Sequence, residues 1–241
     1  MVLGPLLRPD RYFERHAPGL SLARAGAVAL LVALAVTASI GVLGYALAEQ
    51  AAETTVTVDN ENRPPDWVCD DRSDDPESPR YDGCDEPATR EVAASSLVWN
   101  AVSGQLPVAF GGSLAGWLVG AVGMHGLTAL AGGEGSFGDS LAVAGWAQAA
   151  TLPQLVVVTG VFLTFAGGFD PTASEAALRS QVATFRSDLR SPVVVLGATV
   201  TTVWQGYVYY HGMRHARNVT RDAALLIALV SGAAVLVTQL S

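Results

Sequence analysis

Two histidines four residues apart form the pattern in this chain that is best suited to holding a metal ion. His211 and His215 would lie on one face of a helix, because residues at i and i+4 are neighbours there. Arg214 lies between them and Arg217 follows, and two nearby cations disfavour a third. We therefore expect no metal site, and we interpret Arg214, Arg217 and Arg221 as a cytoplasmic anchor that meets anionic lipid headgroups.

Six aspartates that are closely spaced in one segment raise the question of calcium. They do not follow the EF-hand order, in which Asp and Asn alternate with other residues before a glycine. The absence of lysine and the excess of Asp over Glu favour a solvated acidic surface, as in an organism adapted to high salt, and calcium binding is the alternative. The six are Asp70, Asp71, Asp74, Asp75, Asp82 and Asp85.

Enzyme motifs are missing from the sequence. The segment 111–115 reads Gly-Gly-Ser-Leu-Ala, which lacks the final glycine of a nucleophile elbow, so Ser113 is expected to be a small packing residue. The chain also has no H-E-x-x-H, Walker A or C-x-x-C motif. These observations predict a protein that is not an enzyme and that uses no cofactor.

The distribution of charge defines the elements that must position these residues. Half of the 241 residues are hydrophobic and the net charge is −8, which excludes a disordered chain and a basic nucleic-acid-binding protein. Charged residues are absent from five long stretches of 19 to 42 residues, each long enough for a membrane-spanning helix. The stretches are 25–48, 92–133, 140–169, 191–213 and 223–241.

We therefore predict an all-α membrane protein, a bundle of five transmembrane helices with an acidic extracellular loop that is closed by a disulfide. In the 42-residue stretch, Gln105 and Pro107 favour an interfacial or leading helix over 92–104 before the span, and a sixth span is the alternative. The expected organisation is a cytoplasmic segment 1–24, a first span 25–48, a loop 49–91 and a four-span domain 92–241, with spans at about 107–130, 140–166, 191–211 and 222–240.

The orientation depends on the first span, because the two sides of the membrane carry equal numbers of arginines in this topology. Four arginines precede the first span and none follows it for 14 residues. The positive-inside rule then places the N-terminus in the cytoplasm and the C-terminus outside a cell membrane.

The loop over 49–91 carries 14 acidic residues and four arginines. Its prolines discourage regular structure. Cys69 and Cys84, the only cysteines, lie in this loop, where an exterior location permits a disulfide, and we predict that they pair.

Within the spans, glycines and one proline are the informative residues. Gly112, Gly116 and Gly120 form two overlapping G-x-x-x-G steps, which allow close helix packing inside the bundle or between copies of the chain, so a homo-oligomer is possible. Pro153 is expected to kink the third span. A small carrier or channel lined by Pro153, Gln148, Gln154 and Gln205 is the alternative to a scaffold, and cation sensing by the acidic loop is another.

Three separate stretches together resemble the Ypt-interacting protein (Yip) domain family in its prokaryotic form. The first is Pro9-Asp10-Arg11-Tyr12-Phe13, the second runs from His125 to Pro153, and the third begins at Trp204. The residues that match the family pattern are His125, Gly132, Gly133, Phe137, Gly145, Trp146, Trp204 and Gly212.

The resemblance implies about five spanning helices, a cytoplasmic N-terminus and a non-enzymatic role in organising membranes. Eukaryotic members bind Rab-type GTPases, and we do not expect that partner here. The large acidic loop is not typical of the family. The expected partner is the lipid bilayer, no nucleic acid is expected, and the sequence names no protein partner.

Overall fold

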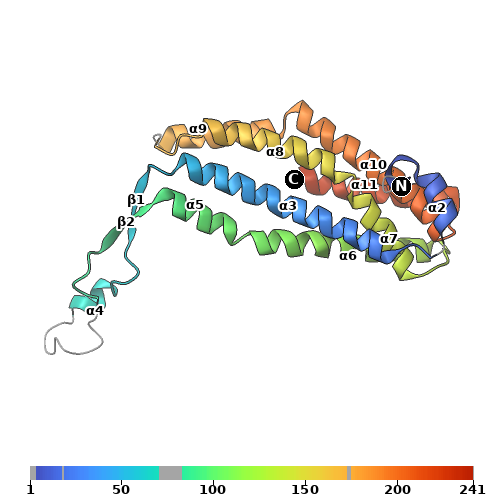
Figure 1. Ribbon diagram of the computed structural model, residues 1–241, viewed down its shortest axis with the longest axis horizontal. Coiled ribbons are helices and arrows are strands. Elements are labelled where there is room, and N and C mark those ends of the chain that lie inside the picture. The colour runs from blue at the N-terminus through green and yellow to red at the C-terminus, as the bar shows by residue number, and fades with distance from the viewer. Residues whose placement is uncertain (1–3, 18, 71–82, 173–174, 241) are drawn as a thin grey trace.

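Long uncharged stretches of this chain form helices that lie side by side (Figure 1). The computed structural model describes all residues except 1–3, 18, 71–82, 173–174 and 241. The helices are α1 (Gly4–Leu7), α2 (Pro9–His16), α3 (Leu22–Gln50), α4 (Asp66–Asp70), α5 (Ala94–Ser103), α6 (Leu106–Leu130), α7 (Phe137–Gln148), α8 (Thr151–Gly168), α9 (Glu175–Leu189), α10 (Pro192–Ala216) and α11 (Arg221–Leu240). The strands are β1 (Thr55–Asp59) and β2 (Thr89–Ala93).

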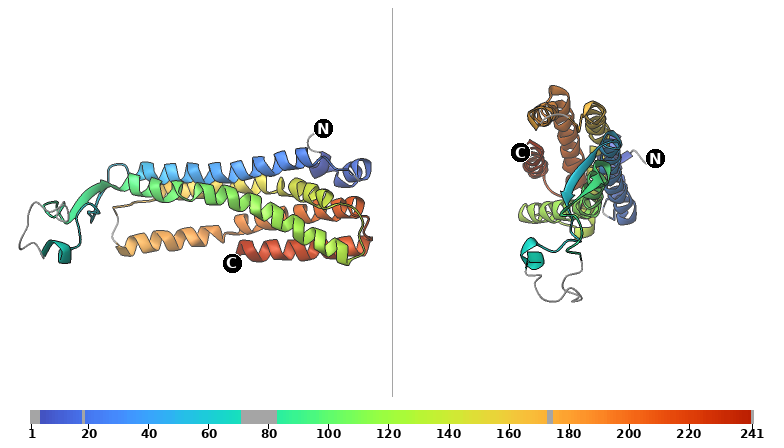
Figure 2. Two further views of the ribbon diagram at one scale, coloured as in Figure 1. Left: turned by 90° about the horizontal axis from the view of Figure 1, so that it is seen from below. Right: turned by 90° about the vertical axis from the view of Figure 1, so that its left-hand side faces the viewer.

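The two strands form an antiparallel ribbon that projects from one end of the bundle (Figure 2). Val56 pairs with Val92, and Ala94 N–H donates to Thr54 O over 2.8 Å where the ribbon meets the helices. The expectation that the loop 49–91 lacks regular structure is therefore wrong near its two ends and at the short helix α4. The alternating sequence Thr-Val-Thr-Val-Asp over 55–59 favours a strand, and the prolines lie between the strands.

The predicted disulfide between Cys69 and Cys84 is present, with the two Cα atoms 5.6 Å apart. Arg63 supports the same region, because its guanidinium donates to Cys84 O over 2.9 Å. Four of the aspartates considered for calcium, Asp71, Asp74, Asp75 and Asp82, lie outside the described residues.

Three helical stretches among the described residues are long and apolar enough to cross a membrane. They are Leu22–Gln50, Ala94–Leu130 and Phe137–Gly168. The second stretch differs from its prediction at its start, because residues 92 and 93 belong to β2; α5 then lies against α3 and leads into α6 (Figure 1).

The third stretch also differs from its prediction. A single kinked helix was expected, but α7 ends at Gln148 and α8 begins at Thr151. Pro153 therefore lies in the first turn of α8, where its missing N–H costs no helical hydrogen bond. The change of direction comes before the proline, at Ala149 and Ala150.

The segment between the third and fourth predicted spans is helical as well, where only a loop was expected. Phe185 on α9 packs against Phe162 and Phe165 on α8, with ring centroids 4.6 and 4.4 Å apart. α9 is thereby held beside the end of α8 before the chain enters α10.

Side-chain size divides the interior of the bundle from its surface. The row Ala25, Ala29 and Ala33 on α3 is fully buried. Large apolar side chains instead face outward, with Val119 on α6 71% exposed and Val203 on α10 68% exposed. Small residues inside and large apolar residues outside are typical of helices that pack closely in lipid.

Candidate functional site

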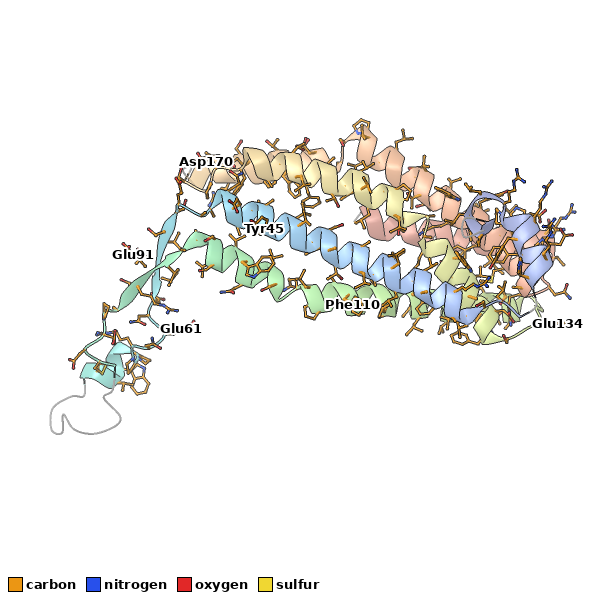
Figure 3. All side chains as sticks on the ribbon, in the orientation of Figure 1. Tyr45, Glu61, Glu91, Phe110, Glu134 and Asp170 are labelled. Atoms are coloured by element: carbon orange, nitrogen blue, oxygen red, sulfur yellow. A yellow bond between two sulfur atoms is a disulfide. The ribbon has the colours of Figure 1, made fainter. Side chains whose placement is uncertain are left out.

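The described polar contacts of the bundle gather at the end opposite the β ribbon, which we call the polar end. It comprises α1, α2, the turn 131–136 between α6 and α7, and the turn 217–220 between α10 and α11. Figure 3 shows Glu134 at this end, and Glu91 and Asp170 at the other. Helices far apart in the sequence therefore bring their ends together here.

A cluster of Asp10, His211, His215 and Arg214 joins α2 to α10. His215 Nε2 lies 2.8 Å and His211 Nδ1 3.0 Å from the same oxygen, Asp10 Oδ1, so that both imidazoles can donate to one carboxylate. Arg214 Nη1 lies 3.9 Å from that oxygen. The hydrogen bond from His215 is the largest influence that lowers the pKa of Asp10 below its ordinary value. The cluster therefore links α2 to α10 through hydrogen bonds and an ion pair.

The same residues define the set that could hold a metal. The ligand atoms of Asp10, His211 and His215 all lie within 4.8 Å of one another. The guanidinium of Arg214 shares the carboxylate with them and adds a positive charge, which opposes binding of a cation. The geometry fits a hydrogen-bonded ion-pair network better than a metal centre.

Aromatic contacts hold the rest of the N-terminal segment on the bundle. Trp204 Nε1–H on α10 donates to Leu6 O over 2.9 Å. Tyr12 on α2 makes an edge contact with Trp146 on α7, with ring centroids 5.9 Å apart. Phe13 is fully buried. The residues before the first span are thus packed against α7 and α10.

Arg217 connects two turns at the polar end. Its side chain is only 2% exposed, and its guanidinium donates to Thr128 Oγ1 over 3.1 Å, to Ser136 O over 3.2 Å and to Gly135 O. In return, Glu134 N–H donates to Arg217 O over 2.8 Å. Arg217 therefore differs from the exposed headgroup anchor that the sequence suggested, because its charge is used inside the protein.

The start of α7 is fixed by a capping box. Ser136 Oγ accepts from Asp139 N–H, while the Asp139 carboxylate accepts from Ser136 N–H. The other Asp139 oxygen, Oδ1, accepts from Gly19 N–H over 3.2 Å, so the carboxylate also holds the linker that leads into α3.

Two glycines of the family pattern mark close contacts of α7 with its neighbours. A β-carbon at Gly145 would lie 2.7 Å from Ala25 O on α3. A β-carbon at Gly212 on α10 would lie 2.9 Å from Val143 Cγ2. Any larger residue at either position would push the helices apart.

The remaining pattern residues shape the turn between α6 and α7. Gly132 has a φ of +75°, which favours glycine, and Gly133 N–H donates to Thr128 O over 2.8 Å. His125 packs edge-on against Phe137, with ring centroids 5.4 Å apart. These residues act together as structural elements of the polar end.

The glycine row Gly112, Gly116 and Gly120 on α6 lies elsewhere. A β-carbon added at any of the three would meet nothing within 4 Å. Among the described residues, the row therefore faces away from the other helices, which favours contact with a second copy over packing inside the bundle.

Comparison with protein families matches residues 3–241 to the Yip1 domain. The chain belongs to the Yip1 domain family. The match spans the bundle and the acidic segment alike. No curated protein and no solved structure matches the chain.

The sequence did not predict the roles that Asp10, Asp139 and Thr128 have in this Yip1 domain. Asp10 is separated from His211 by 201 positions, and no local pattern links two residues that far apart. A serine followed three residues later by Asp139 was available as a capping signal. The cap of α7 is this serine, Ser136.

Proposed function

We propose that this Yip1-family protein is a five-pass, non-enzymatic scaffold that organises the cell membrane. The apolar side chains that face outward on α3, α6, α8, α10 and α11 support the spanning arrangement. α10 and α11 would complete the five passes, because they pack against each other and α10 also packs against α7.

In this arrangement the polar end faces the cytoplasm and the ribbon faces outward. Four arginines on and after the N-terminal helices, Arg8, Arg11, Arg15 and Arg24, support that orientation under the positive-inside rule. The disulfide at the opposite end supports an oxidising exterior. The C-terminus would then lie toward the outer side.

The outward glycine row of α6 is the observation that best supports a scaffold. Gly112, Gly116 and Gly120 leave an unfilled strip of backbone on a lipid-facing surface, and such a strip allows a second helix to approach closely. We propose that two copies of the chain associate through this strip. Self-association would give the protein a means of gathering membrane components without any chemical reaction.

Gly116→Ile tests this proposal, because isoleucine would hold a second helix away at a position where an added β-carbon meets nothing within 4 Å. The fraction of dimer in nanodiscs, measured by crosslinking, should fall by at least 5-fold, and the melting temperature should stay unchanged. Gly197→Ile on α10 is the matched control, since a β-carbon there also meets nothing within 4 Å. Equal dimer fractions in wild type and Gly116→Ile would refute the role of the strip.

A small carrier or channel is a second candidate function. The side-chain oxygens Gln148 Oε1 and Gln205 Oε1 are buried without a hydrogen-bond partner, which is costly in a membrane unless water or a solute serves them. Flux of small neutral solutes into proteoliposomes, abolished by Gln205→Leu, would favour this function over the scaffold.

A further inference from the structure

Two apolar grooves run along α10 toward the polar end. The first lies between α1 and α10, has a volume of about 560 Å³ and includes Leu7, Val200 and Trp204. The second lies between α10 and α11, has a volume of about 520 Å³ and includes Gly206 and Leu229. Val203 and Tyr207 line both, so they form a ridge with one groove on either side.

A polar pocket of about 340 Å³ lies at the polar-end side of this ridge. It is lined by Leu7, Arg8, Asp10, Arg11 and Tyr207. Leu7 and Tyr207 also line the first groove, and Tyr207 lines the second. Tyr207 is therefore common to all three hollows, and its ring packs edge-on against His211 at a centroid distance of 4.7 Å.

The charges that line the polar pocket favour an anion. Arg8 and Arg11 are exposed, and in the part of the chain that the structure describes neither forms an ion pair. The Asp10 carboxylate also borders the pocket, but its charge is partly offset by Arg214, and its Oδ1 is engaged in hydrogen bonds with His211 and His215 on α10. The pocket also adjoins the first turn of α2, in which the N–H groups of Asp10 and Arg11 have no acceptor within the helix.

From this arrangement we infer that the protein binds one anionic phospholipid with two acyl chains. The phosphate lies between Arg8 and Arg11, and one chain occupies the groove on each side of the ridge formed by Val203 and Tyr207. The Tyr207 phenol lies where the polar head meets the chains, a position that suits its amphipathic ring. The inference rests on the membrane placement proposed above.

The occupant is a lipid and not a free phosphate because of the two grooves. An inorganic phosphate would use only the arginines and would leave both apolar grooves without a role. A single-chain amphiphile would fill one groove and leave the other. Two grooves that converge on one basic pocket match a ligand with two apolar arms and one acidic head.

The experiment uses the purified full-length protein in mixed vesicles of phosphatidylglycerol and phosphatidylcholine, with a spin-labelled form of each lipid to measure selectivity. The wild type should prefer phosphatidylglycerol, and Arg8→Gln with Arg11→Gln should reduce that preference by about 5-fold for each arginine removed. The matched control is Arg15→Gln with Arg24→Gln, which removes the same charge from exposed positions that do not line the pocket. The control should keep the preference of the wild type.

A second variant tests the contribution of the grooves to lipid binding separately from that of the two arginines. Val203 is 68% exposed, so Val203→Trp should fill the grooves without disturbing the core. It should weaken phosphatidylglycerol binding while both arginines remain, and Val122→Trp on α6, where Val122 is 59% exposed, should not. Displacement of phosphatidylglycerol by inorganic phosphate, at concentrations that leave the vesicle charge unchanged, would overturn the inference in favour of a site for a free anion.

Three further outcomes are informative. If the two double variants lost phosphatidylglycerol selectivity equally, the positive charge would attract the lipid without a defined binding site. That result would overturn the lipid site. A protein that resists alkaline extraction from vesicles yet shows no lipid preference would overturn the lipid site and leave the spanning arrangement intact. A protein released by alkaline extraction would overturn both.

Discussion

The backbone of Gly145 lies directly against that of Ala25. A β-carbon at Gly145 would be 2.7 Å from Ala25 O, a distance that real β-carbons essentially never show. α7 and α3 therefore approach as closely as two helices can. The contact lies beside one that joins two parts of the family pattern, since neighbouring Trp146 reaches Tyr12 of the N-terminal segment.

Gly145→Ala should therefore destabilise the protein even though it adds a single methyl group. Overpacking of this kind costs about 1–3 kcal/mol, because the neighbouring atom is backbone and cannot rotate away. Tryptophan fluorescence during thermal unfolding in detergent measures the loss. Gly123→Ala on α6, where a β-carbon meets nothing within 4 Å, is the control, and an equal effect of the two variants would contradict the close contact.

Arg217→Gln should weaken the polar end, because it removes a charged donor from Thr128 Oγ1 and from two turn carbonyls. Buried hydrogen bonds to charged groups contribute about 1.5–3 kcal/mol, and we expect a loss in that range from denaturant unfolding. Arg221→Gln, at the exposed start of α11, should change the free energy of unfolding by less than about 0.5 kcal/mol. A neutral Arg217→Gln variant would show that the guanidinium does not hold the turns.

The docking of α2 should depend on pH through Asp10. Its pKa is lowered in the folded protein, chiefly by the hydrogen bond from His215, so the contribution of the carboxylate to docking is complete above about pH 3.8. That contribution is lost as the pH falls through the lowered value and Asp10 takes up a proton. Hydrogen exchange over residues 9–16, corrected for the intrinsic rate, should increase across that range.

Asp10→Asn provides the comparison, because it removes the charge at every pH. This variant should show high exchange over α2 already at pH 6 and little further change on acidification. Glu14→Gln alters an exposed carboxyl of the same helix and should behave like the wild type. Persistent pH dependence in Asp10→Asn would assign the effect to another group.

The two cysteines allow a test of orientation on intact cells. A membrane-impermeant maleimide should label Cys69 and Cys84 only after treatment with an impermeant reductant, because the two residues are joined in a disulfide that the proposed orientation places on the outer side. Labelling without reduction would contradict the disulfide. Labelling that also required permeabilised cells would reverse the proposed orientation.

The sequence predicted the long helices because absent charge is a local property. Arg24 and Glu49 enclose the first uncharged stretch, and α3 runs from Leu22 to Gln50. Where two local signals competed, the prediction was less accurate. Pro153 suggested a kink within a helix, whereas the chain breaks earlier and places the proline in a first turn, the position it tolerates best.

The candidate site could not be assembled in the same way, since its contacts join distant parts of the chain. Trp204 was identified from the family pattern, but its hydrogen bond to Leu6 O spans 198 positions. Arg217 was read as one of three exposed cations, because a local sequence does not reveal that the turn after α6 supplies acceptors for its guanidinium. The glycine row was identified from the sequence, but only the fold shows which way the row faces.

β2 continues directly into α5, and only four residues, 51–54, join α3 to β1. A force applied to the ribbon would therefore be transmitted to α3 and α5, which pack against each other. A molecule that binds the ribbon would in this way act mechanically on the first half of the bundle.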